Sequence, residues 1–388
     1  MSNPNNIVYL EDNSVFDRHI DKQDLEPAPK PEGKILDAKF KGEAISYSRD
    51  VWRRFRRDKV TVVAAIFILI IIIMAIVGPH MNEFHYREQN PTFQFLPPRI
   101  PGLQNLGIFT GHRVVTIQYE HIYRWEDSFI ALVDTHERFV RVGQPYVMMA
   151  DIRVCMYTVR GAEDINHWFG TDLLGRDLFT RLWQGTRVSL LLGFGVGLMT
   201  IVMGLFLGAI QGYYGGKIDM IGQRLSEIIW YIPFIPLAVL LILRFGAGFG
   251  TLVLVFFING WIAPAAGVRM QFYRFKHREY VLATRTMGAS DFRLMFKIIL
   301  PNAAGTLITS MILSVPLIIF GEAGLSYLGL GIQAPHPSIG MLLADGQTFL
   351  MQYPYMIAAP AVVIVVLMLA FNLFGNGLRD AFDPTLRQ

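Results

Sequence analysis

Long apolar blocks alternate with polar, charged segments along this chain. Residues 60–79 carry no charge over about 20 positions, the length that a helix needs to cross about 30 Å of hydrocarbon. Comparable blocks occupy roughly residues 188–212, 228–243, 252–268, 303–320 and 355–374. Prolines interrupt the third and fourth blocks, which membrane helices tolerate where neighbouring helices satisfy the freed backbone groups. The pattern therefore predicts six membrane-spanning helices.

Basic residues are distributed unevenly between these blocks. A basic cluster precedes the first block and consists of Arg49, Arg53, Arg54, Arg56, Arg57 and Lys59. The loop 269–301 is also rich in Lys and Arg and contains only Glu279 and Asp291 as acids. The connection before the last block carries Glu322 and Asp345 but no Lys or Arg. Because Lys- and Arg-rich loops stay in the cytoplasm, we expect the loop 269–301 and both termini to be cytoplasmic.

The composition agrees with a membrane protein. Of the 388 residues, 52% are apolar and 17% are charged, which is too apolar for an ordinary soluble domain. The first apolar block begins too late for a secretory signal peptide, so we expect it to remain as an anchor. The single cysteine, Cys155, excludes an internal disulfide. Nucleic-acid binding is an alternative for the basic runs, but they border apolar blocks and lack aromatic stacking platforms, so no nucleic-acid partner is expected.

The N-terminal part divides into a tail and an anchor. Residues 1–48 are polar and mix Asp, Lys and Pro, which is typical of a disordered cytoplasmic tail. In the segment 49–80, Trp52 and Phe55 interleave with arginines ahead of the first span. This interleaving predicts a short amphipathic helix that lies at the membrane surface before the chain enters the membrane.

Residues 81–166 form the longest segment between two apolar blocks. Apolar and polar residues alternate over 113–119 and again over 138–159, which is typical of β-strands. We therefore expect a small β-rich extracytoplasmic insertion. It is either a structural cap or a docking surface for an external partner, and the sequence favours neither.

The polar segment 280–301 separates the fourth and fifth blocks and has the pattern of two short helices. Ala283 shares a helix face with the residue four positions later. Gly288 can end the first helix in the left-handed conformation, and Ser290 or Asp291 can cap the second helix. A short helix with an apolar face and basic flanks, held by a longer helix, suits a groove on a soluble partner.

This segment resembles the cytoplasmic signature loop of ABC importer permeases. That loop reads Glu-Ala-Ala, three residues, Gly, nine residues, Ile, one residue and Leu-Pro. The matching positions here are Ala283, Gly288, Ile298, Leu300 and Pro301. Leu282 stands in place of the Glu and Thr284 in place of the second Ala, while the spacing is intact.

Three further segments narrow the resemblance to the oligopeptide/dipeptide/nickel importer family and to its second permease subunit. Residues 167–191 resemble its Leu-Gly-Thr-Asp-x-x-Gly-Arg-Asp signature, and residues 322–340 resemble its Leu-Ser-Phe-Leu-Gly-Leu-Gly loop. Residues 372–387 resemble its Gly-Asp-Gly-Leu-Arg-Asp-x-x-Asp-Pro tail, with Asn376 in place of the Asp. The four motifs occur in the family's order.

The resemblance implies an all-α polytopic membrane protein with six transmembrane helices of the type I ABC importer (MetI-like) fold. The spans after the first would lie in a permease domain over 167–388, and the β-rich segment would be an insertion. The implied function is that of a permease subunit of an ATP-driven ABC importer in the bacterial cell membrane, moving oligopeptides or dipeptides into the cytoplasm by alternating access. Nickel and glutathione are alternative substrates.

The resemblance also implies a coupling site and partners. The implied ATPase-coupling residues are Glu279, Tyr280, Ala283, Thr284, Met287, Gly288 and Ala289. The implied partners are a homologous second permease in a heterodimer, two ATP-binding subunits, an extracytoplasmic substrate-binding protein, the peptide substrate and membrane lipid. We expect no cofactor, metal or catalytic residue in this chain, because it lacks the Gly-x-x-x-x-Gly-Lys-Ser/Thr loop and the partner subunits would bind ATP and Mg²⁺.

Other functions need other features. A non-transporting membrane receptor or scaffold would share the spans but would not need a docking helix. An intramembrane enzyme needs paired catalytic groups at membrane depth, where only Glu227 comes close; it either has a function or pairs with the nearby Arg224. Asp172, Arg176 and Asp177 are expected to form ion pairs and a helix cap before the second span rather than a metal site.

Overall fold

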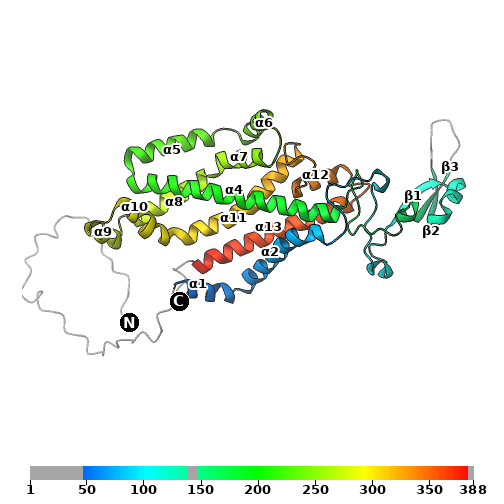
Figure 1. The fold of residues 1–388 in the computed structure, drawn as a ribbon, viewed down its shortest axis with the longest axis horizontal. Helices are drawn as coiled ribbons and strands as arrows, with labels where there is room; N and C mark the ends of the chain where they lie inside the picture. Colours follow the sequence, from blue (N-terminus) through cyan, green and yellow to red (C-terminus); the bar gives the residue numbers. More distant parts are fainter. Residues whose placement is uncertain (1–46, 139–146, 383–388) are drawn as a thin grey trace, which may run out of the picture. The chain divides into compact units, whose positions relative to one another are not determined.

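The structure is a computed structural model that describes residues 47–138 and 147–382 (Figure 1). Residues 1–46 of the expected tail lie outside this range, as does the first part of the expected strand segment 138–159. The helices are α1 (Tyr47–Arg57), α2 (Lys59–Val77), α3 (Met156–Val159), α4 (Leu178–Tyr214), α5 (Gly216–Trp230), α6 (Phe234–Phe245), α7 (Phe249–Gly260), α8 (Ile262–Phe275), α9 (Glu279–Thr286), α10 (Asp291–Arg293), α11 (Leu300–Tyr327), α12 (Ile339–Thr348) and α13 (Tyr355–Phe382). The strands are β1 (His112–Gln118), β2 (Phe129–Arg138) and β3 (Val147–Cys155).

Within the described residues, 5 helical segments are long and apolar enough to cross a membrane: Lys59–His80, Leu178–Tyr214, Phe249–Phe275, Leu307–Tyr327 and Tyr355–Phe382. The pair α5 and α6 makes a sixth if it counts as one span, although the two helices are bent by 78°. The expected third span, 228–243, therefore crosses this bend. Pro233 accounts for the break, because proline cannot donate a backbone hydrogen bond and disfavours the helical conformation of Ile232 before it.

Helix α4 is the element around which the other long helices pack. It contacts α8 and α11 most extensively, and α13 in turn packs against α2 and α11 (Figure 1). Gly204, Gly208 and Gly212 recur at every fourth position of α4 on the side that faces α8. A Cβ added at these glycines would come within 2.4 to 2.6 Å of atoms in α8. This spacing of small residues allows the two helix backbones to approach closely.

The segment between α2 and α4 contains a three-stranded antiparallel sheet in the order β1-β3-β2. On the central strand, Ala150, Ile152 and Val154 alternate with more exposed residues and are buried in a cluster that includes Leu96 and Tyr157. The alternation in the sequence indicates β1 and β3. It does not indicate β2, because the apolar residues of β2 follow one another without alternating with polar ones. Two register shifts also interrupt the pairing of β2 with β3.

Candidate functional site

The candidate site is the polar segment between α8 and α11, and its first element is the short helix α9. The outer side of α9 is exposed: 78% of Met287 and 43% of Leu282 are accessible to solvent, and Ala283 is also exposed. The inner side carries Val281, which is 1% exposed. Helix α9 therefore presents one face to its surroundings and uses the other to attach to the rest of the protein.

The expected coupling residues divide between these two sides. The exposed ones are Glu279, Tyr280, Ala283, Met287 and Gly288. Thr284 and Ala289 are half-buried. The hydroxyl of Thr284 donates to the carbonyl of Tyr280 at 2.7 Å, and Ala289 packs against the buried cluster beneath the helix. Ala289 thus helps to attach the segment to the long helices, and the bond of Thr284 stabilises the turn within α9 itself, whereas the exposed residues are accessible to a partner.

Gly288 ends α9 in the left-handed region of backbone space, at a φ of +85°, as its position in the sequence predicts. The amide of Gly288 donates to the carbonyl of Arg285 at 3.0 Å, and the amide of Ala289 donates to the carbonyl of Thr284 at 3.3 Å. These bonds satisfy carbonyls at the end of the helix. Ser290 occupies the N-cap position of α10, but its side chain makes no capping hydrogen bond.

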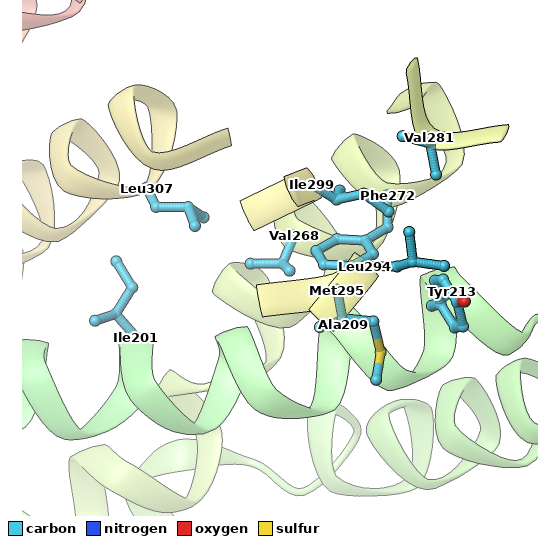
Figure 2. Close-up of a cluster of buried hydrophobic side chains, with 10 residues drawn as sticks. All are labelled: Ile201, Ala209, Tyr213, Val268, Phe272, Val281, Leu294, Met295, Ile299 and Leu307. Atoms are coloured by element: carbon cyan, nitrogen blue, oxygen red, sulfur yellow. The ribbon is translucent and has the colours of Figure 1, made fainter. Parts of the chain in front are cut away.

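A cluster of buried apolar side chains attaches this segment to the long helices (Figure 2). Its members are Ile201, Ala209 and Tyr213 of α4, Val268 and Phe272 of α8, Val281 of α9, Leu307 of α11, and Leu294, Met295 and Ile299 of a π-helical turn between α10 and α11. Phe272, Leu294 and Ile299 are fully buried, and burial of a side chain of this size contributes about 1.5–3 kcal/mol. The cluster therefore fixes the segment firmly against α4 and α8.

Tyr213, near the C-terminal end of α4, connects that helix to both halves of the segment. Its hydroxyl donates to a carboxylate oxygen of Asp291 and accepts a hydrogen bond from Nη2 of Arg285 at 2.8 Å. The Arg285 guanidinium also lies 5.4 Å from the centroid of the Tyr213 ring. The carboxylate that the sequence offers as a helix cap is therefore used to bind α4. Because only 7% of Tyr213 is exposed, the surrounding packing fixes its position.

A second group of polar contacts joins α5 and α8 to the same end of α4. The Asp219 carboxylate accepts hydrogen bonds from Nε and Nη2 of Arg269 at 2.5 and 2.9 Å, and from the hydroxyl of Tyr273 at 2.6 Å. Nζ of Lys276 donates to the carbonyl of Gly212 at 3.0 Å. These contacts make α4, α5 and α8 a common support for the segment that carries α9.

Charged residues gather in the interior at the other end of α4. The Asp172 carboxylate accepts a hydrogen bond from Nε of Arg176 at 2.7 Å and pairs with Nη1 of Arg181. Asp177 caps α4 and lies 2.9 Å from Nδ1 of His167. The expected ion pair and helix cap are therefore confirmed. Within residues 47–138 and 147–382, no group of three or more His, Cys, Asp or Glu is placed to hold a metal ion.

The sequence indicates the burial of neither of two further ionisable residues of this region: no motif position marks Arg181, and Glu322 is assigned to the polar connection before the last apolar block. Arg181 is fully buried in α4, and Glu322 is fully buried in α11. The Glu322 carboxylate accepts hydrogen bonds from the hydroxyls of Ser326 and Ser338 at 2.6 and 2.7 Å. Their position inside apolar helices is the signal that could have identified them. Tyr213 carries no such signal, because aromatic residues are common at the ends of membrane spans.

Glu227 of α5, which the sequence offers either as a functional residue or as a partner of Arg224, lies beside Arg224 in the structure. Nη1 of Arg224 lies 2.7 Å from a carboxylate oxygen of Glu227, and both side chains are exposed. The two residues pair with each other on the surface of α5. The structure thus favours mutual pairing over a catalytic role for Glu227.

A mainly apolar cavity of about 590 Å³ lies between α4, α7, α8 and α11. Most of its wall consists of Gly, Val, Ile, Leu and Met side chains. The polar lining residues are Thr200, Gln271, Ser310 and Ser314. The cavity is thus bounded by the same helices, α4, α8 and α11, that hold the segment with α9.

Two family models match this chain, one over its C-terminal half and one over the region of its first span. The family described as binding-protein-dependent transport system inner membrane component matches residues 201–388. The N-terminal TM domain of oligopeptide transport permease C matches residues 46–98. Among solved structures, a chain of the inward-facing MetNI methionine ABC transporter is similar with a TM-score of 0.41 and 19% identity, over 53% of this chain and 96% of that chain.

Two relatives match over nearly their whole length. The dipeptide transport system permease protein DppC of Bacillus subtilis is 34% identical over 349 residues, which cover 90% of this chain and 89% of that protein. The oligopeptide transport system permease protein OppC of Bacillus subtilis is 34% identical over 372 residues, which cover 96% of this chain and 100% of that protein. This chain therefore belongs to the family of ABC transport permease subunits, inner membrane proteins with several membrane-spanning helices, that includes DppC and OppC.

Proposed function

We propose that this protein is the second permease subunit of an ATP-driven importer that moves dipeptides or oligopeptides into the bacterial cytoplasm. Its similarity to dipeptide and oligopeptide permeases over nearly the whole chain supports this substrate class. The observation that carries the proposal is the geometry of α9. A permease of this family needs a surface through which an ATPase can act, and α9 is an exposed helix attached firmly to the long helices.

The proposed arrangement in the membrane has six spans, with the bent pair α5 and α6 as the third. Both termini and α9 are cytoplasmic, and the segment 81–166, with its sheet, is an extracytoplasmic insertion. The basic residues of α1 and of the loop 269–301 support this orientation, since Lys and Arg accumulate on the cytoplasmic side. The tail 1–48 precedes the interfacial helix, and the permease domain extends over 167–388.

In the proposed mechanism, the exposed side of α9 lies in a groove of an ATP-binding subunit. Closure of the ATPases on ATP pushes α9. Because the buried cluster and Tyr213 attach this helix to α4 and α8, the push moves these spans as a rigid group. Leu282 occupies the position where the family signature has Glu, so the docking surface carries an exposed apolar side chain there. Glu279, three residues earlier, is an exposed acid.

We also propose that the cavity between α4, α8 and α11 is part of the peptide path. Its apolar wall accommodates varied side chains, and its Thr, Gln and Ser residues can bind the backbone amides that all peptides share. A homologous second permease would supply the opposite wall, so that the two subunits rock around a central path. A substrate-binding protein delivers the peptide from outside. Two partner ATPases bind ATP and Mg²⁺, so this chain carries neither cofactor nor catalytic site.

Purification of the complex from its native membrane tests the proposed function. We expect two ATP-binding subunits and a second permease to co-elute with this chain. After reconstitution with the binding protein, a dipeptide or a pentapeptide should stimulate ATP hydrolysis, whereas nickel and glutathione should not. Stimulation by nickel or glutathione alone would replace the peptide assignment. A chain that elutes without any ATPase would favour a receptor or scaffold.

The Tyr213→Phe variant tests the connection between α9 and α4. The change removes one hydroxyl that bonds both Asp291 and Arg285, which costs about 0.5–1.5 kcal/mol per hydrogen bond. We expect the stimulation of ATP hydrolysis by peptide to fall several-fold while basal hydrolysis changes little. Tyr214→Phe is the matched control, because Tyr214 is the next residue and is half exposed. Equal stimulation in both variants would show that the Tyr213 hydroxyl does not transmit the movement.

A further inference from the structure

Helices α2 and α13 enclose an apolar groove of about 460 Å³ that the proposed transport mechanism does not use. Val63 and Phe67 of α2 face Leu369 and Leu373 of α13 across it, and each of these side chains is about half exposed. Among residues 47–138 and 147–382, Lys59, at the first position of α2, is the only charged one that lines the groove. The groove thus combines an open apolar channel with a cation at one end.

Further cations lie at the same end. The ring of Phe55 on α1 packs edge-on against Phe374, 5.9 Å between centroids, and Phe374 follows the groove residue Leu373. This contact holds α1 beside the Lys59 end of the groove. The same helix carries the exposed residues Arg53, Arg56 and Arg57. The groove therefore ends in a cluster of basic side chains.

The nearest acid in the sequence, Asp58, offsets only one of these positive charges. The Asp58 carboxylate caps α2, accepting hydrogen bonds from the amide of Val60 at 3.0 Å and from the hydroxyl of Thr61. Within the described part of the chain, no ion pair joins Lys59 or the exposed arginines of α1 to an acidic side chain. The basic end of the groove is thus available to an external anion.

We propose that the groove binds an anionic phospholipid. One acyl chain lies between α2 and α13, and the phosphate pairs with Lys59 and with the exposed arginines Arg53, Arg56 and Arg57 of α1. A diacyl lipid has both required parts, a long apolar chain and a negative group at the membrane surface, where basic residues beside a span attract anionic lipids. A helix of another protein would fill the apolar channel, but it would need an acidic side chain at this depth to pair with the basic end, and such side chains are rare in membrane spans.

Native mass spectrometry of the intact complex tests this proposal, with dioleoylphosphatidylglycerol and dioleoylphosphatidylcholine as probes. The unchanged complex is expected to retain the anionic lipid preferentially. Lys59→Gln should weaken phosphatidylglycerol binding about fivefold, which corresponds to about 1 kcal/mol for one basic residue near the membrane surface. Phosphatidylcholine binding should be unchanged in that variant. Leu369→Trp should fill the groove and reduce the retention of both lipids.

Matched controls distinguish the groove from the rest of the surface. Lys217→Gln on α5 and Leu240→Trp on α6 alter exposed residues elsewhere and should retain both lipids as the unchanged complex does. Retention of phosphatidylglycerol by Lys59→Gln and Leu369→Trp at the unchanged level would overturn the proposal. A Leu373→Cys variant that crosslinks to the second permease would overturn it as well, because a protein would then fill the groove. These measurements need no transport activity, so their outcome is independent of the proposed function.

Discussion

Replacing Ala283 with Trp is expected to abolish most of the peptide-stimulated ATP hydrolysis of the assembled complex while the permease stays folded. Ala283 lies on the exposed side of α9, four residues before Met287. If this side of α9 docks into the groove of an ATP-binding subunit, the indole of a Trp at position 283 prevents close contact between α9 and that groove. Overpacking a tight contact costs about 1–3 kcal/mol, which weakens docking by about 5- to 150-fold.

The measurement compares ATP hydrolysis with and without peptide in reconstituted complexes, together with thermal unfolding of the permease. Met351→Trp is the control, because Met351 is 96% exposed in the connection between α12 and α13, which we place on the opposite side of the membrane. This control should hydrolyse ATP like the unchanged complex. Full peptide stimulation in Ala283→Trp would contradict docking through this face.

The largest effect on stability is expected for Asp172→Asn. The substitution removes the charge that Arg176 and Arg181 share, and Arg181 is fully buried. Its next acidic neighbour, Asp345, is 3.9 Å away and its side chain is 40% exposed, so this residue is a poor substitute. Loss of one partner from a buried ion pair costs about 3–5 kcal/mol, because the remaining charge stays in a low-dielectric interior.

The thermal unfolding of purified Asp172→Asn should therefore begin at a clearly lower temperature than that of the unchanged protein. Glu227→Gln is the matched control, because it breaks the exposed pair with Arg224, and exposed pairs contribute about 0.2–1 kcal/mol. Equal shifts in the two variants would contradict the view that burial makes the Asp172 cluster important.

The sequence predicts the elements that depend on local patterns. Five of the six predicted spans follow from apolar length, whereas the third crosses the bend between α5 and α6. The left-handed Gly288 follows from its position between two helical patterns. The exposed Ala283 and Met287 follow from helical spacing within one short segment. Each of these features requires only neighbouring residues, so the sequence alone is sufficient to identify them.

The contacts that support the candidate site could not be predicted in this way. Tyr213 and Asp291 are 78 positions apart in the sequence, and no local pattern pairs them. The close approach of α4 and α8 depends on which residues of α8 face the glycines of α4, and this follows only from the three-dimensional packing. Arg181 is recognisable as unusual in an apolar helix, but its partner Asp172 precedes that helix in a loop. Long-range contacts thus determine how α9 is held.

Site-specific crosslinking from α9 tests the central claim most directly. Cys155 is the only cysteine of this chain, so the Cys155→Ser variant provides a permease subunit without thiols. In this background, Met287→Cys is expected to crosslink to an ATP-binding subunit when the complex is treated with a short thiol-to-amine reagent, and Met351→Cys is expected not to do so. Efficient assembly without any crosslink from Met287→Cys to an ATPase, or crosslinking of that cysteine to the substrate-binding protein, would contradict the account.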